Sequence, residues 1–363
     1  HNVRCTVVSP VPIHEIVISK NTFPYRSVHR TRKGMKVQVF RPRFVSVGSR
    51  DSYRFFGPLN PSLLTLAGFT RATERTITCE SLTPEAIYGH FLYLAGAAAA
   101  RIGDRLNIPA FPCVGEGEFG TVRRFGPEQA REDFAKVSGF LANSARLKRI
   151  LTETLEVDPR SVGVFPNGAD LHAFRPREKV TARKRYGLPL NRFLVACVGN
   201  YLYKKGPVRV GQAIEGLEGV GGIFAGSGPV PPEGENVLFS RRLPHDEIPY
   251  FLSAADVFVL PTLIEGSCNA IVEAMACGLP VISSDGDFND ELLSEDMSIR
   301  LDPLDVGQIR AAITSLRDDP VWCANMAEAA RQRAELFDIN KRARNILQFM
   351  EKRIAKSHRF SGK

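Results

Sequence analysis

The chain has 363 residues, a mass of 40.1 kDa and a net charge of +9; its apolar fraction of 44% and charged fraction of 24% exclude a largely disordered or low-complexity protein. At about 100–200 residues per domain, this length predicts two domains. The longest apolar run, Phe91–Ala100, ends at Arg101. It has about half the length of a membrane-spanning helix, which excludes a polytopic membrane protein.

The positive charge is concentrated in the first sixty residues. They hold eleven lysines and arginines but only two acids, Glu15 and Asp51, so eleven minus two accounts for the whole net charge of +9. We therefore expect an anionic partner, such as nucleic acid, a phosphorylated ligand or acidic lipid headgroups, with a solvated basic surface as the alternative. The basic residues are Arg4, Lys20, Arg26, Arg30, Arg32, Lys33, Lys36, Arg41, Arg43, Arg50 and Arg54.

In the first half of the chain, short apolar runs alternate with helical patterns. Residues 45–80 give no clear assignment, and residues 174–189, rich in Pro, Arg and Lys, are predicted to be a linker. Helices are predicted over Leu92–Asn107 and Ala145–Leu155. Strands are predicted over Val3–Val8, Lys36–Phe44, Ala86–Gly89, Ala110–Val114, Gly139–Ala142 and Gly163–Phe165.

The second half alternates more regularly. Its strands are continuous apolar runs, and continuous apolar strands with helical crossovers predict a parallel sheet covered on both faces. Strands are predicted over Phe193–Val198, Gly222–Ala225, Val237–Phe239, Val257–Pro261 and Pro280–Ser284. Helices are predicted over Glu247–Ala255, Asn269–Cys277, Val306–Leu316, Trp322–Phe337 and Asn340–Ser357.

The pattern as a whole predicts an α/β protein of two doubly wound, Rossmann-like domains that face each other across a cleft. Such sheets bind ligands beyond the carboxyl ends of their strands. We expect an N-terminal domain over residues 1–175, a C-terminal domain over residues 176–339, and a last helical segment, residues 340–363, that packs back toward the N-terminal domain.

The seven cysteines are odd in number, and no two have Cys-x-x-Cys spacing. This pattern predicts reduced, buried thiols in a cytosolic protein and neither a disulfide framework nor a zinc site. They are Cys5, Cys79, Cys113, Cys197, Cys268, Cys277 and Cys323.

The segment Pro261–Val281 carries the strongest local signal. A strand is predicted to end at Pro261 and a helix to begin near Asn269, which can serve as the N-cap. The free amides and partial positive charge of a helix N-terminus favour a phosphate, and Gly266 permits close approach of the backbone. Two carboxylates beside a phosphate, Glu265 and Glu273, are suited to sugar hydroxyls. The segment therefore predicts a ligand with phosphates between two polyols.

The pair Glu265-x7-Glu273, followed by Ala-Met-Ala-Cys-Gly-Leu-Pro-Val, resembles the signature of the retaining glycosyltransferases of family 4, which have the GT-B fold. Four further motifs resemble those of the family in order and spacing. They are the domain-junction motif Val164–Pro176, the phosphate-contact loop Gly199–Gly206, and the segments Ala225–Pro229 and Leu243–Pro261.

The resemblance implies a role for each motif residue. Glu273 would bind the ribose hydroxyls of a nucleotide donor, and Glu265 the hydroxyls of the transferred sugar. Lys205, with Lys204, would neutralise the diphosphate leaving group, which makes a bound metal or other cofactor unnecessary. The remaining donor contacts would come from Gly199, Asn200, the backbone at Arg242 and Leu243, Gly266, Ser267, Cys268 and Asn269.

On the donor side, one residue departs from the family pattern, and one segment resembles a motif of a different glycosyltransferase fold. Many relatives carry an arginine where this chain has Asn200, and Lys204 is the candidate to replace its charge. Asp285-Gly-Asp287 matches the DxD pattern that holds a metal in the other large glycosyltransferase fold. We interpret it here as a polar loop beside the donor cleft, without a metal.

The resemblance weakens in the first half. His90 lies at a strand–helix turn that the family also has, either as a catalytic or as a structural histidine. Glu116 stands near the position of a family histidine and is the candidate to accept the proton of the acceptor hydroxyl. The amino terminus resembles the second strand of the family's first domain, so the first strand–helix unit is expected to be missing.

Together these features predict a retaining glycosyltransferase that moves a sugar from a UDP- or GDP-linked donor to a hydroxyl of a glycan or polyprenyl-diphosphate-linked acceptor. The basic first sixty residues and the family resemblance place it in the cytoplasm, on the inner face of an anionic membrane, in surface-polysaccharide synthesis. The alternatives are a sugar-nucleotide epimerase and a non-catalytic sugar-nucleotide-binding module. A nucleic-acid-binding protein would explain the charge but none of the motifs, so we expect no nucleic acid partner.

Overall fold

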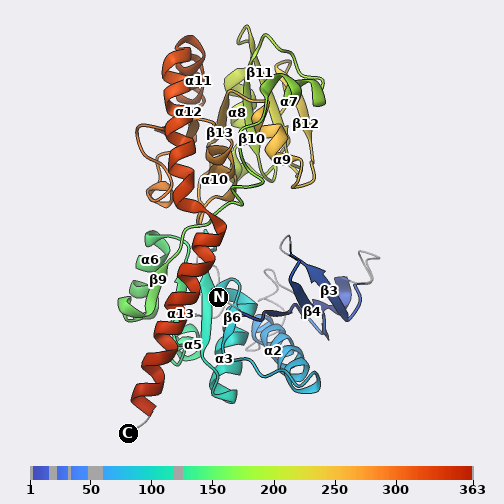
Figure 1. Cartoon of the computed structure of the whole chain (residues 1–363), viewed down its shortest axis with the longest axis vertical. Coiled ribbons are helices and arrows are strands. Elements are labelled where there is room, and N and C mark those ends of the chain that lie inside the picture. Colours follow the sequence, from blue (N-terminus) through green and yellow to red (C-terminus); the bar gives the residue numbers. More distant parts are fainter. Residues whose placement is uncertain (1–2, 16–22, 32–33, 48–59, 118–125, 362–363) are drawn as a thin grey trace. The chain divides into compact units, whose positions relative to one another are not determined.

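The computed structural model describes residues 3–15, 23–31, 34–47, 60–117 and 126–361 (Figure 1). The chain forms two compact units. The first unit comprises residues 1–142, 147–164 and 346–363, and the second comprises residues 143–146 and 165–345. The last helix, α13 (Ile339–Ser361), begins in the second unit and ends in the first.

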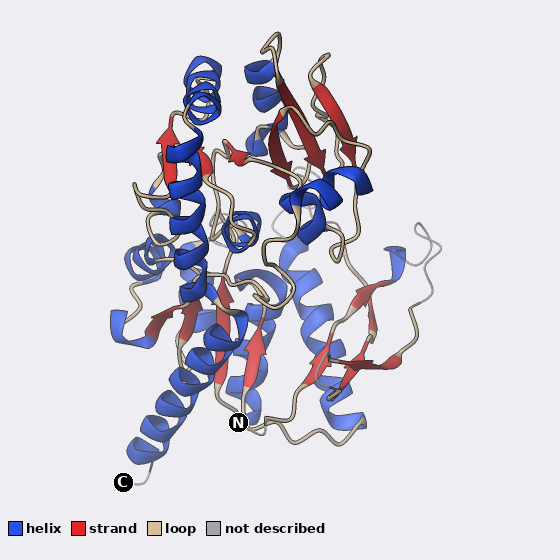
Figure 2. Cartoon of the chain, turned by 45° about the horizontal axis from the view of Figure 1, so that its top comes forward, coloured by secondary structure: helices blue, strands red, loops and turns tan. Residues whose placement is uncertain are grey.

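The second unit is built on a six-stranded, fully parallel sheet in the order β12-β11-β10-β13-β14-β15 (Figure 2). Its central strands are wholly apolar and buried because helices cover both faces of the sheet. The strands are β10 (Phe193–Val198), β11 (Val220–Ala225), β12 (Val237–Arg241), β13 (Val257–Leu260), β14 (Val281–Ser284) and β15 (Ser298–Leu301). Five of these six were predicted; β15 was not.

Helices of the second unit separate most of its strands, and two consecutive helices follow the last strand. They are α7 (Lys179–Arg185), α8 (Pro207–Ile214), α9 (Ile248–Ser253), α10 (Asn269–Ala276), α11 (Val306–Asp318) and α12 (Pro320–Ala334), with short 3-10 turns at Tyr203–Lys205, Asp287–Asn289 and Glu335–Phe337. Residues 174–189 were predicted to be a linker. This is wrong for residues 179–185, which form helix α7. Glu178 accepts the amide hydrogens of Val180 and Thr181 and thereby caps α7.

The described residues of the first unit form three small sheets. The largest has four parallel strands in the order β6-β7-β8-β9, and the others are β1-β4-β3, in which β3 runs antiparallel, and the pair β2-β5. The strands are β1 (Thr6–Val8), β2 (Val11–Pro12), β3 (Arg26–Arg30), β4 (Lys36–Phe40), β5 (Arg43–Phe44), β6 (Ile87–Gly89), β7 (Ala110–Val114), β8 (Phe140–Ala142) and β9 (Val162–Val164). The helices are α2 (Pro61–Cys79), α3 (Ala97–Leu106), α5 (Pro127–Phe134) and α6 (Ala145–Leu155), besides the π-type turn Leu92–Gly96 and the 3-10 turn Pro159–Ser161.

Three predictions for the first unit need correction. The predicted strand Lys36–Phe44 is two strands, β4 and β5, with Pro42 between them, where a proline cannot donate to a strand ladder. The predicted helix Leu92–Asn107 starts as a π-type turn with non-helical backbone at Tyr93 and Leu94, and only α3 is regular. Part of the unassigned stretch 45–80 is helix α2, whose N-cap Asn60 accepts the amide hydrogen of Ser62.

All seven cysteines are free thiols, but the prediction that they are buried is wrong for Cys5 and Cys79, which are exposed, and for Cys323, which is half-buried. Cys113, Cys197, Cys268 and Cys277 are buried. Burial raises the pKa of Cys197, Cys268 and Cys277 to about 12, so these thiols are neutral near pH 7. Among the helices that the structure describes, none has the length and apolar character needed to cross a bilayer.

Candidate functional site

The strand order of the second unit reverses between β10 and β13. Strands β11 and β12 lie on one side of β10, whereas β13, β14 and β15 lie on the other. The loops that follow β10 and β13 therefore emerge side by side at the carboxyl end of the sheet, where doubly wound sheets bind their ligands. The two loops are residues 199–206 and 261–268, which carry most of the predicted donor-binding residues.

The loop after β10 packs tightly against the loop after β11. A Cβ atom on Gly226 would lie 1.9 Å from the carbonyl oxygen of Gly199, and one on Gly228 would lie 2.4 Å from that of Tyr201. Gly199, with φ of +148°, turns the chain where the side chain of Asn200 is exposed. The glycines of this region are therefore needed for contact between two backbones.

Lys205 and Glu265 form an ion pair that joins the two loops, and both side chains are mostly buried. Glu265 also accepts a hydrogen bond from the hydroxyl of the buried Thr262 at 3.1 Å. Burial alone would lower the pKa of Lys205, but Cys268 and Glu265 outweigh it, so the pKa lies above its ordinary value. Lys204 is exposed, and its carbonyl oxygen accepts the amide hydrogen of Leu263 at 2.8 Å.

Helix α10 begins beside this pair. Gly266, Ser267 and Cys268 are buried, whereas Asn269 is exposed. Asn269 was predicted to be the N-cap, which is wrong: Cys268 occupies that position with extended backbone, and Asn269 is the first helical residue. The first amides of a helix have no partner within the helix, so this end can receive an anion.

Asn167, in the domain-junction motif, holds the loop before α10 in place. Its amide N–H donates to Ser267 Oγ at 3.0 Å, and its side-chain Nδ2 donates to the carbonyl oxygen of Ser267 at 2.8 Å. Asn143 Nδ2 donates to Asn167 Oδ1 at 3.1 Å, and Arg342 donates to Asn143 Oδ1 at 3.0 Å. Sequence reasoning missed this network because its members lie far apart in the chain.

Glu273, one turn into α10, contacts a histidine that was not predicted to take part in the site. The distance between Glu273 Oε1 and His245 Nε2 is 2.9 Å, and the imidazole also packs on Phe174, with ring centroids 5.3 Å apart. Burial raises the pKa of the Glu273 carboxyl group, and His245 partly offsets this effect. Arg242 and Leu243 follow β12 at the same edge of the sheet, Arg242 exposed and Leu243 half-buried.

The two predicted site residues of the first unit are His90 and Glu116. The exposed His90 accepts or donates a hydrogen bond at Nδ1 with the hydroxyl of Tyr88, 2.8 Å away. Glu116 accepts the amide hydrogens of Leu92 at 2.7 Å, Tyr93 at 3.4 Å and Gly115 at 3.1 Å, so its carboxylate anchors the π-type turn. Its role as a proton acceptor stays a prediction.

The Asp285-Gly-Asp287 segment is engaged by arginines. Asp285 pairs with Arg300 at 3.1 Å, and Asp287 pairs with Arg146 at 3.1 Å. Across the ranges that the structure describes, no three His, Cys, Asp or Glu side chains are grouped so that they could hold a metal ion.

Comparison with known proteins adds independent information. Residues 233–333, which include Glu265 and Glu273, match the family model of glycosyl transferases group 1. A Bacillus subtilis (strain 168) glycosyltransferase, TuaC, assigned by name to teichuronic acid biosynthesis, is 27% identical over 94% of this chain and 88% of its own length. An Escherichia coli UDP-Gal:alpha-D-GlcNAc-diphosphoundecaprenol alpha-1,3-galactosyltransferase is 31% identical over 55% of this chain and 56% of its own.

Solved structures agree on the fold. Sucrose-phosphate synthase from Thermosynechococcus elongatus superimposes with a TM-score of 0.72 at 20% identity, covering 92% of this chain and 86% of its own. Anabaena HepE, solved in complex with UDP and glucose, superimposes with a TM-score of 0.67 at 17% identity, covering 86% of each chain. The chain therefore has the α/β architecture with parallel sheets of the GT-B fold, as predicted.

Proposed function

We propose that this protein is a retaining glycosyltransferase that transfers a sugar from a nucleotide-diphosphate sugar to a hydroxyl of a glycan or lipid-linked glycan in surface-polysaccharide synthesis. The observation that carries the proposal is the Lys205–Glu265 pair, which lies at the reversal point of the sheet, beside the start of α10. A cation, a carboxylate and free helix amides in one place suit a diphosphate joined to a sugar.

The proposed roles follow the chemistry of the groups. Glu273 accepts hydrogen bonds from the ribose hydroxyls, and the backbone at Arg242 and Leu243 contacts the base. Lys205 and the first amides of α10 stabilise the negative charge that grows on the departing nucleoside diphosphate. Glu265 leaves Lys205 when the donor binds and accepts hydrogen bonds from the transferred sugar. Neutralisation by Lys205 allows this step without a metal ion.

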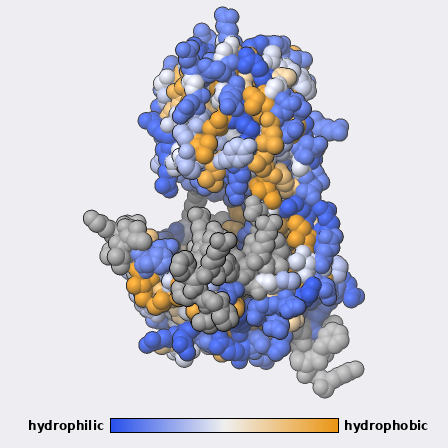
Figure 3. All heavy atoms as spheres, turned by 180° about the vertical axis from the view of Figure 1, so that it is seen from behind, coloured by the Kyte–Doolittle hydropathy of each residue, from blue (hydrophilic) through white to orange (hydrophobic). Residues whose placement is uncertain are grey.

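The acceptor proposal rests on the relatives and on the charge of the first unit. One relative is named for a galactosyl transfer to a diphosphoundecaprenol-linked sugar. The hairpin β3–β4 exposes Val28 and Met35 beside Arg26, Arg30 and Lys36, and Figure 3 shows hydrophobic next to hydrophilic residues on this side of the first unit. Mixed basic and apolar surfaces suit an anionic bilayer, so we include peripheral binding to the inner face of the cytoplasmic membrane in the proposal.

Thermal shift with UDP, GDP, ADP and CMP in the absence of metal tests the donor side. A nucleotide at 100 times its Kd adds about 2.7 kcal/mol to the free energy of unfolding. One diphosphate should stabilise the wild type, and Glu273→Ala should abolish the response. Incubation of the matching nucleotide sugar with a polyprenyl-diphosphate-linked glycan, followed by NMR of the anomeric proton, then tests both transfer and retention.

Sedimentation with vesicles tests the membrane component separately. Vesicles that contain anionic phosphatidylglycerol should retain the protein, and vesicles of phosphatidylcholine alone should not. The paired charge reversals Arg26→Glu and Arg30→Glu should reduce this retention without affecting the thermal shift by nucleotide. Equal binding to both kinds of vesicle would contradict the electrostatic part of the proposal.

A further inference from the structure

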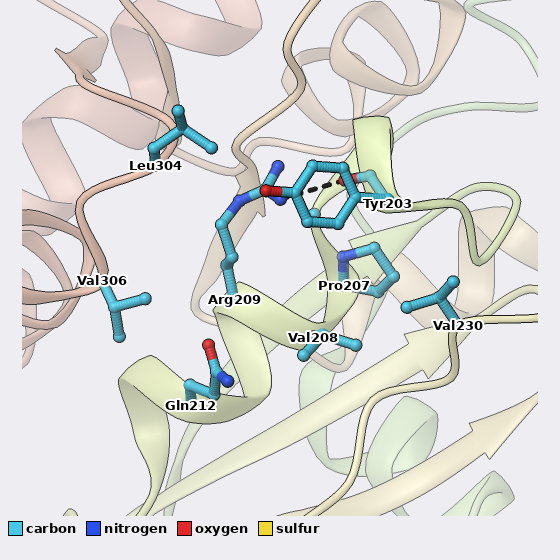
Figure 4. Close-up of a pocket in the computed structure, with 9 residues that line it drawn as sticks. Tyr203, Pro207, Val208, Arg209, Gln212, Val230, Leu304 and Val306 are labelled. Atoms are coloured by element: carbon cyan, nitrogen blue, oxygen red, sulfur yellow. Dashed lines mark hydrogen bonds between the residues drawn. The ribbon is translucent and has the colours of Figure 1, made fainter.

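Arg209 is a buried arginine of α8 that the donor-site roles above do not use. Only 6% of the residue is exposed, and it lines a pocket of about 400 Å³ together with Tyr203, Pro207, Leu304 and Val306 (Figure 4). Within the described part of the chain, no carboxylate forms an ion pair with Arg209, and its Nε has no hydrogen-bond partner. A buried cation without a counter-ion destabilises the folded state. The contacts that the Arg209 guanidinium group makes in return therefore need an explanation.

The guanidinium group of Arg209 bridges the two loops of the candidate site. Its Nη1 donates to the carbonyl oxygen of Tyr203 at 3.0 Å, and its Nη2 donates to that of Pro261 at 2.8 Å. Tyr203 precedes Lys205 by two residues, and Pro261 precedes Glu265 by four. The planar, forked donor set of arginine can make both bonds at once, whereas a lysine ammonium lacks that fork.

The backbone at Gly206 lies directly against the Arg209 guanidinium group and leaves no room for a side chain. Gly206 has a φ of +75°, and a Cβ atom there would lie 2.7 Å from both Arg209 Nη2 and the carbonyl oxygen of Pro261. Leu263 and Lys204 add a backbone hydrogen bond of 2.8 Å between the same loops. The two loops are therefore joined by Arg209 and by this backbone bond, in addition to the Lys205–Glu265 pair.

We propose that Arg209 is a positioning residue that holds the backbones of the Lys205 loop and the Glu265 loop at a fixed separation, and so sets the distance between the groups that contact the diphosphate and the sugar of the donor. Its importance for catalysis rests on the proposed function, whereas its effect on the two loops does not. A misplacement of about 1 Å in such a site reduces turnover by about 100-fold. We therefore expect Arg209→Met and Arg209→Lys to lower kcat by about 100-fold and to change the donor KM much less.

A matched control is Arg310, a residue of another helix that contacts the C-terminal end of α8. It lies on α11 and also donates to two carbonyl oxygens, those of Ala213 at 3.3 Å and Glu215 at 2.7 Å. Arg310→Met therefore removes a comparable two-carbonyl bridge from α8 without touching the candidate site.

Hydrogen–deuterium exchange of the ligand-free proteins tests the proposal without any substrate. The amides of Lys205, Gly206 and Leu263 should exchange at least about tenfold faster in Arg209→Met and Arg209→Lys than in the wild type, and at the wild-type rate in Arg310→Met. Unchanged exchange in Arg209→Met, or equal acceleration in Arg310→Met, would overturn the positioning role. Full turnover by Arg209→Lys would also overturn it, because charge alone would then suffice.

The same experiments separate this proposal from the proposed function. If the wild type transfers no sugar from any nucleotide donor, the proposed function fails, and the exchange measurements alone decide the role of Arg209 in holding the loops. If the wild type is active, the kcat of Arg209→Lys and the exchange data must agree.

Discussion

Nε2 of His245 lies 2.9 Å from Oε1 of Glu273, although 73% of the histidine side chain is exposed and only 12% of the glutamate side chain is. One oxygen of the carboxylate proposed to bind ribose is thus already occupied by a surface imidazole that also packs on Phe174. A nucleotide that takes the place of the imidazole at Oε1 of Glu273 has to break this contact.

The first prediction concerns this displacement. We expect His245→Ala to bind the preferred nucleoside diphosphate about fivefold more tightly, because about 1 kcal/mol of hydrogen bond no longer has to be broken. Isothermal titration calorimetry measures the change, and His172→Ala, which removes another exposed histidine of the same unit, serves as the control. Weaker binding by His245→Ala would indicate instead that the imidazole contacts the nucleotide.

The second prediction follows from the raised pKa of Glu273. As pH rises through the ordinary carboxyl range, the unfolded chain releases this proton before the folded protein does, so the folded state loses stability up to its own raised pKa. Above that pKa the loss is complete. We expect Glu273→Gln to have a higher Tm than the wild type at pH 7 and no such advantage at pH 4. If the wild-type Tm at pH 7 equals or exceeds that of Glu273→Gln, the ionised Glu273 carboxylate does not destabilise the folded protein, and the prediction fails.

The third prediction separates the two adjacent lysines. Lys205→Met should lower kcat by about 100- to 1000-fold, as expected when one preorganised charge is removed, whereas Lys204→Met should retain kcat within about threefold because Lys204 is exposed. Lys205→Met also leaves Glu265 unpaired, so its Tm should fall. The double variant Lys205→Met/Glu265→Gln should recover Tm but not kcat. Equal effects of the two single substitutions would refute the assignment.

The fourth prediction concerns the support of the loop before α10. Asn167→Ala removes two side-chain bonds, the one to the carbonyl oxygen of Ser267 and the one from Asn143, whereas Ser267→Ala removes only the acceptor of the Asn167 amide. In urea titrations Asn167→Ala should lower the free energy of unfolding by about 2 kcal/mol and Ser267→Ala by about 1 kcal/mol. Both single variants should bind nucleoside diphosphate more weakly, since the amides at the start of α10 lose their fixed position. Undiminished binding would show that this loop needs no support from Asn167.

Much of the second unit could be predicted from the sequence because its physics is local. A run such as Phe193–Val198 is apolar throughout, and only a strand that is covered on both faces of its sheet buries all the side chains of such a run. The same holds for Val257–Leu260, which also sets the place of Glu265 after a strand and before helix α10. The first unit was less predictable: Pro42 divides a strand, and the carboxylate of Glu116 holds a turn that no periodicity reveals.

The sequence by itself determined the residue types of the proposed donor site, since Lys205, Glu265 and Glu273 belong to motifs that are readable in order along the chain. Only the tertiary structure decided which of them meet. Strands β10 and β13 are separated by more than fifty residues of sequence yet pair directly, and this pairing brings Lys205 onto Glu265. The contacts of Arg209, His245 and Asn167 also depend on this packing, and such contacts leave no period or spacing in the sequence.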